Sequence, residues 1–95
     1  MKATLIVDQR DDLPKGVIVV QRVYRLAEPN LGAPHGYSYR LHCGTTEGQT
    51  LVRFDNETGK GDHVHQGDTE YPYIFTTVDQ LLTDFEAAIQ PFIGD

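Results

Sequence analysis

Short stretches in which apolar and polar residues alternate dominate the first half of the chain, and this period of two is typical of β-strands. We expect a short strand at residues 3–7 and a longer one at residues 16–26, separated by the turn residues Asp11, Asp12 and Pro14. The longer segment places apolar side chains on both of its faces. It therefore predicts a central strand whose two faces are largely covered.

Residues 36–43 and 49–55 alternate more regularly, and the four residues 45–48 between them are typical of a hairpin turn. The core-facing side of the first strand carries Tyr37, Tyr39, Leu41 and Cys43. On the opposite face of this hairpin we expect Arg40, His42, Arg53 and Asp55. A four-residue turn would place Arg40 directly across from Arg53, so an anion or a carboxylate would have to lie between the two charges.

The C-terminal part predicts a loop at residues 28–35, a last strand at residues 71–75 and a helix at residues 77–90. Thr77 and Gln80 match a capping box, an apolar stripe follows with helical spacing, and Pro91 should end the helix. The expected fold is α+β, a curved antiparallel sheet of about five strands with a single C-terminal helix packed on one face. Residues 1–95 should form a single domain.

Composition and net charge limit the partners and the cellular compartment that we expect for this domain. The chain has 95 residues and a net charge of −6, which argues against general attraction to nucleic acids or anionic lipids, although Arg40, Arg53, Lys60 and the histidines lie in the middle of the chain. The lone Cys43 fits a reducing compartment, and no apolar run is long enough for a signal peptide or a membrane span. We expect a cytoplasmic protein without membrane contact, which a partner or a second copy in a homodimer would stabilise.

The densest cluster of ionisable side chains lies between residues 53 and 65, and all four histidines fall between residues 35 and 65. Metal-free RNA cleavage needs a proton acceptor, a proton donor and a cation that stabilises the phosphoryl oxygens. The candidate catalytic residues are His63, His65, Lys60 and Arg40. Candidates for supporting or substrate-binding roles are Arg53, Asp55, Asn56, Gly59, Gly61, Asp62, Tyr39 and His35.

The same residues permit other interpretations. Asp62, His63 and His65 could bind a divalent metal, because imidazoles two residues apart on an extended segment point the same way. The charges of this segment could instead pair among themselves and stabilise an ordered loop. A module that binds nucleic acid or a protein partner without performing chemistry also fits the acidic composition.

Three segments identify a resemblance: Pro34-His35-Gly36-Tyr37-Ser38-Tyr39-Arg40-Leu41, Phe54-Asp55-Asn56 and Gly59-Lys60-Gly61-Asp62-His63-Val64-His65, followed by a short amphipathic helix. Over nearly its full length the chain resembles the TumE family of small toxins. The resemblance implies a toxin of a type II toxin–antitoxin pair, an adjacent gene for a helix-turn-helix antitoxin, and ribonuclease action on RNA. Phe54 stands where the family often has Tyr, and Val64 where an Arg is common, so one hydroxyl and one cation are missing here.

Overall fold

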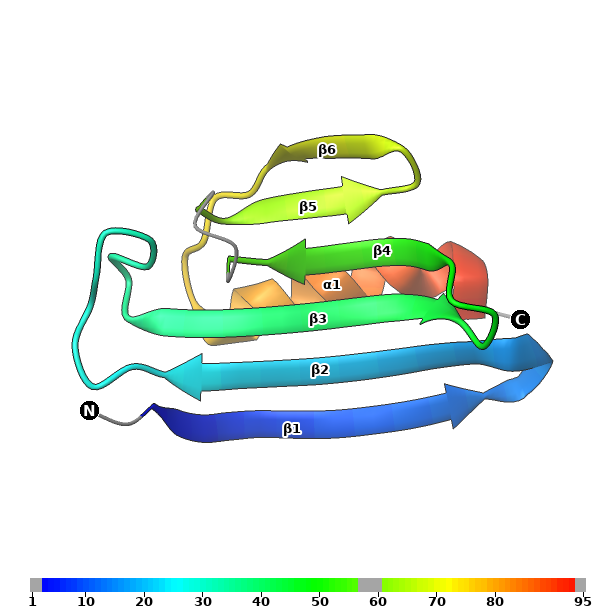
Figure 1. Ribbon diagram of the computed structural model, residues 1–95, viewed down its shortest axis with the longest axis horizontal. Coiled ribbons are helices and arrows are strands. Elements are labelled where there is room, and N and C mark those ends of the chain that lie inside the picture. Colours follow the sequence, from blue (N-terminus) through cyan, green and yellow to red (C-terminus); the bar gives the residue numbers. More distant parts are fainter. Residues whose placement is uncertain (1–2, 57–60, 94–95) are drawn as a thin grey trace.

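The computed structural model describes residues 3–56 and 61–93, which form one six-stranded antiparallel sheet and one α-helix (Figure 1). The strands lie side by side in chain order: β1 (Thr4–Leu13), β2 (Val17–Arg25), β3 (Tyr37–Thr45), β4 (Thr50–Asp55), β5 (His63–Gln66) and β6 (Thr69–Pro72). A 3₁₀ turn (Pro14–Gly16) joins the first two strands, and the helix α1 (Val78–Ile93) follows the last one. The predicted α+β architecture is confirmed, with six strands rather than about five.

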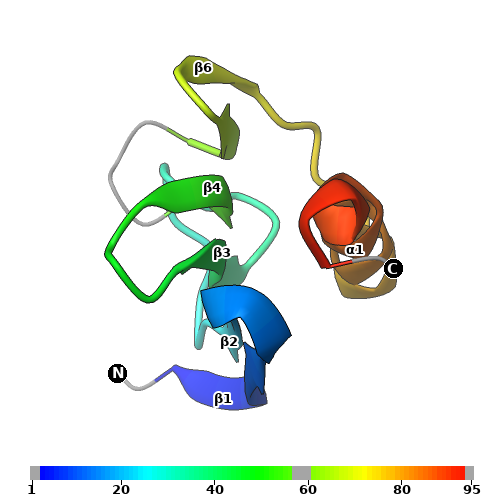
Figure 2. The same ribbon diagram turned by 90° about the vertical axis from the view of Figure 1, so that its right-hand side faces the viewer.

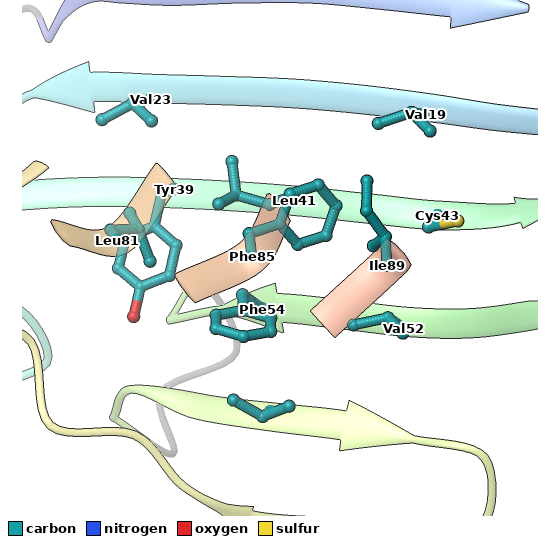
Figure 3. Packing of buried hydrophobic residues seen from close by; sticks show 11 residues of the cluster. Val19, Val23, Tyr39, Leu41, Cys43, Val52, Phe54, Leu81, Phe85 and Ile89 are labelled. Atoms are coloured by element: carbon teal, nitrogen blue, oxygen red, sulfur yellow. The ribbon is translucent and has the colours of Figure 1, made fainter. Parts of the chain in front are cut away.

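In the described part of the chain, the helix covers one face of the sheet and no helix lies on the other face (Figure 2). The core lies between α1 and strands β2 to β5, where alternate strand residues meet the apolar stripe of the helix (Figure 3). Buried members of this core are Val19, Val23, Tyr39, Leu41, Cys43, Val52, Phe54, Val64, Leu81, Phe85 and Ile89. The predicted core side of β3 is thus confirmed, and the uncovered face of the sheet is called the open face below.

Two expectations for the N-terminal strands are wrong. β1 extends to Leu13 rather than ending near Val7, because residues 8–12, including the expected turn residues Asp11 and Asp12, pair with β2 although they are mostly charged. β2 is central but buries only the face that carries Val19 and Val23, whereas Ile18 and Val20 on its open face are half-buried. The described residues form a single α-helix, and it packs on the face of the sheet that carries Val19 and Val23.

The C-terminal expectations need similar corrections. The last strand ends at Pro72, before most of the predicted segment 71–75, and it forms a hairpin with β5 that the alternation-based prediction missed. Pro91 lies inside α1 rather than ending it, and the helix continues to Ile93, which packs against the core. In the last turn a proline removes one backbone hydrogen bond, and the apolar contact of Ile93 outweighs that loss.

The β3–β4 register also differs from the four-residue turn considered above. Arg40 lies opposite Asp55, and His42 lies opposite Arg53, because an irregularity between Cys43 and Gly44 shifts the pairing. The prediction that all four residues share one face is confirmed. The expected clash of Arg40 with Arg53 does not occur, since a carboxylate rather than a guanidinium stands opposite Arg40.

Candidate functional site

Strand pairing aligns polar residues in two rows across the open face. One row runs through Arg22, Arg40, Asp55 and His63, which are successive partners on β2, β3, β4 and β5. The other runs through His42, Arg53, His65 and Glu70 on β3, β4, β5 and β6. Because side chains at directly paired positions point the same way, the sheet gathers basic, acidic and imidazole groups over β4 to β6.

Asp55 lies at the centre of this cluster and is only 2% exposed. Its Oδ2 atom is 2.8 Å from Nε of Arg53, and its Oδ1 atom is 3.2 Å from Nε2 of His63. These are charge contacts rather than well-aligned hydrogen bonds, since neither Arg53 Nε nor Asp55 Oδ1 has a hydrogen-bond partner of suitable geometry. Burial of this carboxylate therefore depends on the two positive or ionisable neighbours.

The imidazole of His63 is oriented by a hydrogen bond from Nδ1, the ring nitrogen that faces away from Asp55. Its Nδ1 lies 2.9 Å from the carbonyl oxygen of Gly61, and a carbonyl can only accept, so Nδ1 carries a proton. Nε2 therefore points at Asp55 and also lies 3.5 Å from Oε2 of Glu70. The side chain is almost fully buried, at 6% exposure.

His65 is the more accessible imidazole, at 27% exposure, and its Nε2 lies 3.0 Å from Oε2 of Glu70. The two imidazole rings stand edge to face with centroids 5.2 Å apart. One carboxylate oxygen of Glu70 thus contacts both histidines. Among the described residues, these three are the group of His, Cys and acidic side chains whose donor atoms come together, within 4.8 Å of one another.

The cations of the open face differ in their surroundings. Arg40 is exposed and has no ion pair with another described residue, so its guanidinium is available to an anion. Arg53 is three-quarters buried against Asp55. His42 lies on β3, two residues from Arg40 and opposite Arg53 on β4. Its pKa is below the ordinary value because of partial burial first and the positive charges of these two arginines second.

A second polar cluster lies away from this face, around Asp62. Its Oδ2 atom accepts a hydrogen bond from the Tyr39 hydroxyl at 2.6 Å and lies 2.8 Å from Nε2 of His35. His35 stacks on Phe75 with ring centroids 3.9 Å apart. Burial and the Asp62 carboxylate raise the pKa of Tyr39 far above its usual range, so the phenol remains a proton donor.

The remaining predicted residues have local roles or lie outside the described part. Asn56 is buried and clamps β3, with its Oδ1 accepting from the Tyr39 amide and its Nδ2 donating to the Tyr37 carbonyl. Gly61 has φ 77, a left-handed conformation that suits glycine, and it presents the carbonyl that orients His63. Gly59 and Lys60 lie outside the described residues.

The structure therefore brings His63, His65, Arg53 and Asp55 together, with Arg40 beside them, and places Asp62, Tyr39 and His35 in the separate cluster. Sequence reasoning missed Glu70. The signal was available, because Gly67 and Asp68 are suited to a two-residue hairpin turn that pairs residue 65 with residue 70.

A family model described as Toxin TumE matches residues 3–93. The chain belongs to the TumE family of toxins. No curated protein and no solved structure matches it. As a TumE-family member it is the toxin of a toxin–antitoxin system, and an antitoxin is its implied partner.

In this TumE-family chain the side chain at position 64 belongs to the hydrophobic core and not to the open face. Val64 is 1% exposed and belongs to the core, on the face opposite to that of His63 and His65. A valine here contributes apolar packing, and among the described residues Arg53 on β4 is the cation paired directly with His65. None of the helices in the described part of the toxin is long and apolar enough to cross a membrane.

Proposed function

We propose that this toxin is an endoribonuclease that cleaves RNA on its open face by metal-independent acid/base chemistry. The observation that carries the proposal is the placement of two imidazoles whose ring centroids are 5.2 Å apart, each against a carboxylate, with Arg53 opposite His65 on β4. Strand cleavage through the 2′-hydroxyl needs one group that accepts a proton and one that donates it. Cleavage of the RNA strand in this way needs no metal ion when cationic side chains stabilise the negative charge on the phosphoryl oxygens.

His65 is the imidazole that contacts the substrate in this proposal, because it is the more exposed of the two. When its Nε2–H is held by Glu70, Nδ1 becomes the proton-accepting nitrogen, and it takes the proton of the 2′-hydroxyl. Glu70 thereby orients the ring and stabilises the imidazolium that forms, as a carboxylate does beside a catalytic histidine in general. His63, charged and paired with Asp55, supplies the proton to the departing 5′-oxygen.

Arg40 and Arg53 hold the phosphate. Arg40 is exposed and lies in the row that contains His63, and Arg53 lies directly opposite His65. Both side chains present planar guanidinium groups that suit phosphate oxygens. Lys60 is the third cation in the proposal, on the strength of its place in the sequence motif. These charges give a local anion site on a chain whose net charge is −6.

The partner in this proposal is a helix-turn-helix antitoxin from an adjacent gene, and the toxin acts in the cytoplasm. An antitoxin silences such a site by covering the open face or by contributing a carboxylate to its arginines. Inhibition then follows from binding alone, with no change in the toxin's fold.

The test is cleavage of labelled total RNA by antitoxin-free protein, with and without EDTA, beside the double variant His63→Ala, His65→Ala. His42→Ala is the matched control, since it removes an imidazole from the same face without touching the carboxylates of the site. We expect cleavage that survives EDTA, persists in the control and disappears in the double variant. Equal cleavage by the double variant would refute the assignment of the two imidazoles, and the absence of any cleavage by folded wild-type protein would indicate a binding module.

A further inference from the structure

We propose that His63, His65 and Glu70 form a binding site for one divalent transition-metal ion of the zinc type. This inference goes beyond the ribonuclease proposal and does not depend on it, because it concerns an ion and not RNA. It also differs from the ligand set expected from sequence, in which Asp62 stood in the place that the structure gives to Glu70.

The spacing of the three donor atoms suits a small ion. In a tetrahedral zinc site with bonds of about 2.0–2.2 Å, neighbouring ligand atoms lie about 3.3–3.5 Å apart. Oε2 of Glu70 lies 3.0 Å from Nε2 of His65 and 3.5 Å from Nε2 of His63. All three donors lie within 4.8 Å of one another, so the geometry needs small rotations of the half-buried His65 and the exposed Glu70 side chains.

The orientation of His63 is an independent indication. Its Nδ1 donates to the Gly61 carbonyl, which is how a metal-binding histidine is commonly held, and Nε2 is then the nitrogen turned toward the site. In the neutral ring this nitrogen is a bare lone pair facing oxygens of Asp55 and Glu70. Such a contact is repulsive unless a proton or a metal ion lies between the nitrogen and the oxygens.

Asp55 supplies a second indication. Its carboxylate is 2% exposed, and Oδ1 has no hydrogen bond of suitable geometry although it lies 3.2 Å from Nε2 of His63. A buried acceptor without a hydrogen bond is costly, and a bound cation next to it would offset the cost. We assign Asp55 the role of a positioning residue beside the ion, with His63, His65 and Glu70 as ligands.

The donor set selects the class of metal. Two imidazoles and one carboxylate suit Zn²⁺, Co²⁺ and similar ions, whereas Mg²⁺ and Ca²⁺ prefer oxygen donors throughout. Glu70 is 37% exposed and His65 27%, so an ion can enter from solvent and keep a water ligand. Since the ion and the catalytic proton use the same nitrogens, bound Zn²⁺ should inhibit the proposed ribonuclease rather than activate it.

The experiment is a titration of tag-free protein with Co²⁺, followed by visible absorption, and then displacement of Co²⁺ by Zn²⁺. We expect one equivalent to bind. Glu70→Gln and His65→Ala should weaken binding by about 100-fold or more, because loss of a ligand costs at least as much as loss of a supporting residue. Two matched controls, His42→Ala and Asp62→Asn, should bind within about twofold of wild type because neither residue is in the ligand set. Circular dichroism establishes that each variant is folded.

The site would be overturned by a folded wild-type protein that binds no Co²⁺, or by a Glu70→Gln variant that binds as tightly as wild type. Loss of binding in Asp62→Asn alone would replace this ligand set with the one expected from sequence and so also overturn it. Binding is read without RNA, so its outcome is separate from that of the cleavage assay. Metal binding in a protein that cleaves no RNA would support this inference while removing the proposed function.

Discussion

Replacing Tyr39 by phenylalanine tests the cluster that surrounds Asp62. The ring of Tyr39 is fully buried, and its hydroxyl donates a 2.6 Å hydrogen bond to Oδ2 of Asp62. The phenylalanine variant keeps the ring and removes the donor, so that among the described side chains His35 is left to contact the partly buried carboxylate. Hydrogen bonds to charged groups contribute about 1.5–3 kcal/mol, so we expect the free energy of unfolding to fall by that amount.

Tyr73→Phe is a closely matched control. Tyr73 donates a hydrogen bond of the same 2.6 Å length to Oδ2 of Asp84, but Asp84 is half-buried and also accepts from Gln80, so its carboxylate has a second donor. Solvent and Gln80 can satisfy that carboxylate after the hydroxyl is lost. We expect this variant to lose less than about 1 kcal/mol.

Alkaline pH provides a second measurement on the same variant. The folded pKa of Tyr39 is raised, mainly by burial and then by Asp62, whereas an unfolded tyrosine titrates near pH 10. Stability from this proton is therefore complete below about pH 10 and is lost above it, at about 1.4 kcal/mol per pH unit. Tyr39→Phe lacks this loss, so the difference in stability between the two proteins should narrow above pH 10.

Urea unfolding followed by circular dichroism gives both quantities, provided that the slope of the free energy against urea is unchanged. Equal destabilisation by Tyr39→Phe and Tyr73→Phe at pH 7 would refute the argument, because burial is the property that separates the two hydroxyls. A constant difference between wild type and Tyr39→Phe across pH 10 would refute the assignment of the raised pKa.

Three further predictions concern β3. Gly44→Ala should lower the free energy of unfolding by about 1–3 kcal/mol, because an added Cβ would lie 2.7 Å from the Gln49 carbonyl oxygen and 2.6 Å from the His42 ring. Urea unfolding measures this loss, and a stability within error of wild type would contradict the close packing. The Cys43 thiol is buried and burial raises its pKa, so an aromatic disulfide reagent should label it only as fast as the protein opens, and rapid labelling of the folded protein would show the thiol to be accessible. The pKa of His42 is lowered in the folded protein, so below about pH 6.5 the unfolded chain takes up a proton that the folded chain does not, and stability falls as the pH is lowered. Urea unfolding of His42→Gln should therefore show a shallower decline in stability between about pH 7.5 and pH 5 than wild type. An equal decline in the two proteins would refute the lowered pKa.

Alternation predicts most of the sheet because the period of two is a local property. It gave β2, β3 and β4 and their shared faces, and the apolar stripe gave α1. The sequence pattern failed for β1, where residues 8–12 pair with β2 despite their charge. It also failed for Pro91, because the helix continues to Ile93, which packs against the core. In both places contacts that are distant in the sequence decide the structure.

The candidate site was predictable in part for the same reason. Two imidazoles separated by one residue on an extended segment must share a face, and that is where His63 and His65 lie. Their partner Glu70 depends on the register of the β5–β6 hairpin, and the burial of Asp55 depends on neighbours from two strands. Asp62 looked like a ligand by proximity in sequence, but its carboxylate turns to Tyr39 and His35 on the other side of the chain.

The strictly sequential order of the strands has a consequence for biosynthesis. Each strand from β2 onward pairs with the strand just before it, so the sheet can grow from its N-terminal edge as the polypeptide emerges from the ribosome, without closing a long loop. β1, β2 and β3 supply Arg40 but none of the imidazole or carboxylate groups that gather around His63. Those groups meet only when the β5–β6 hairpin adds to β4, so the toxin's candidate site can be completed only late in translation.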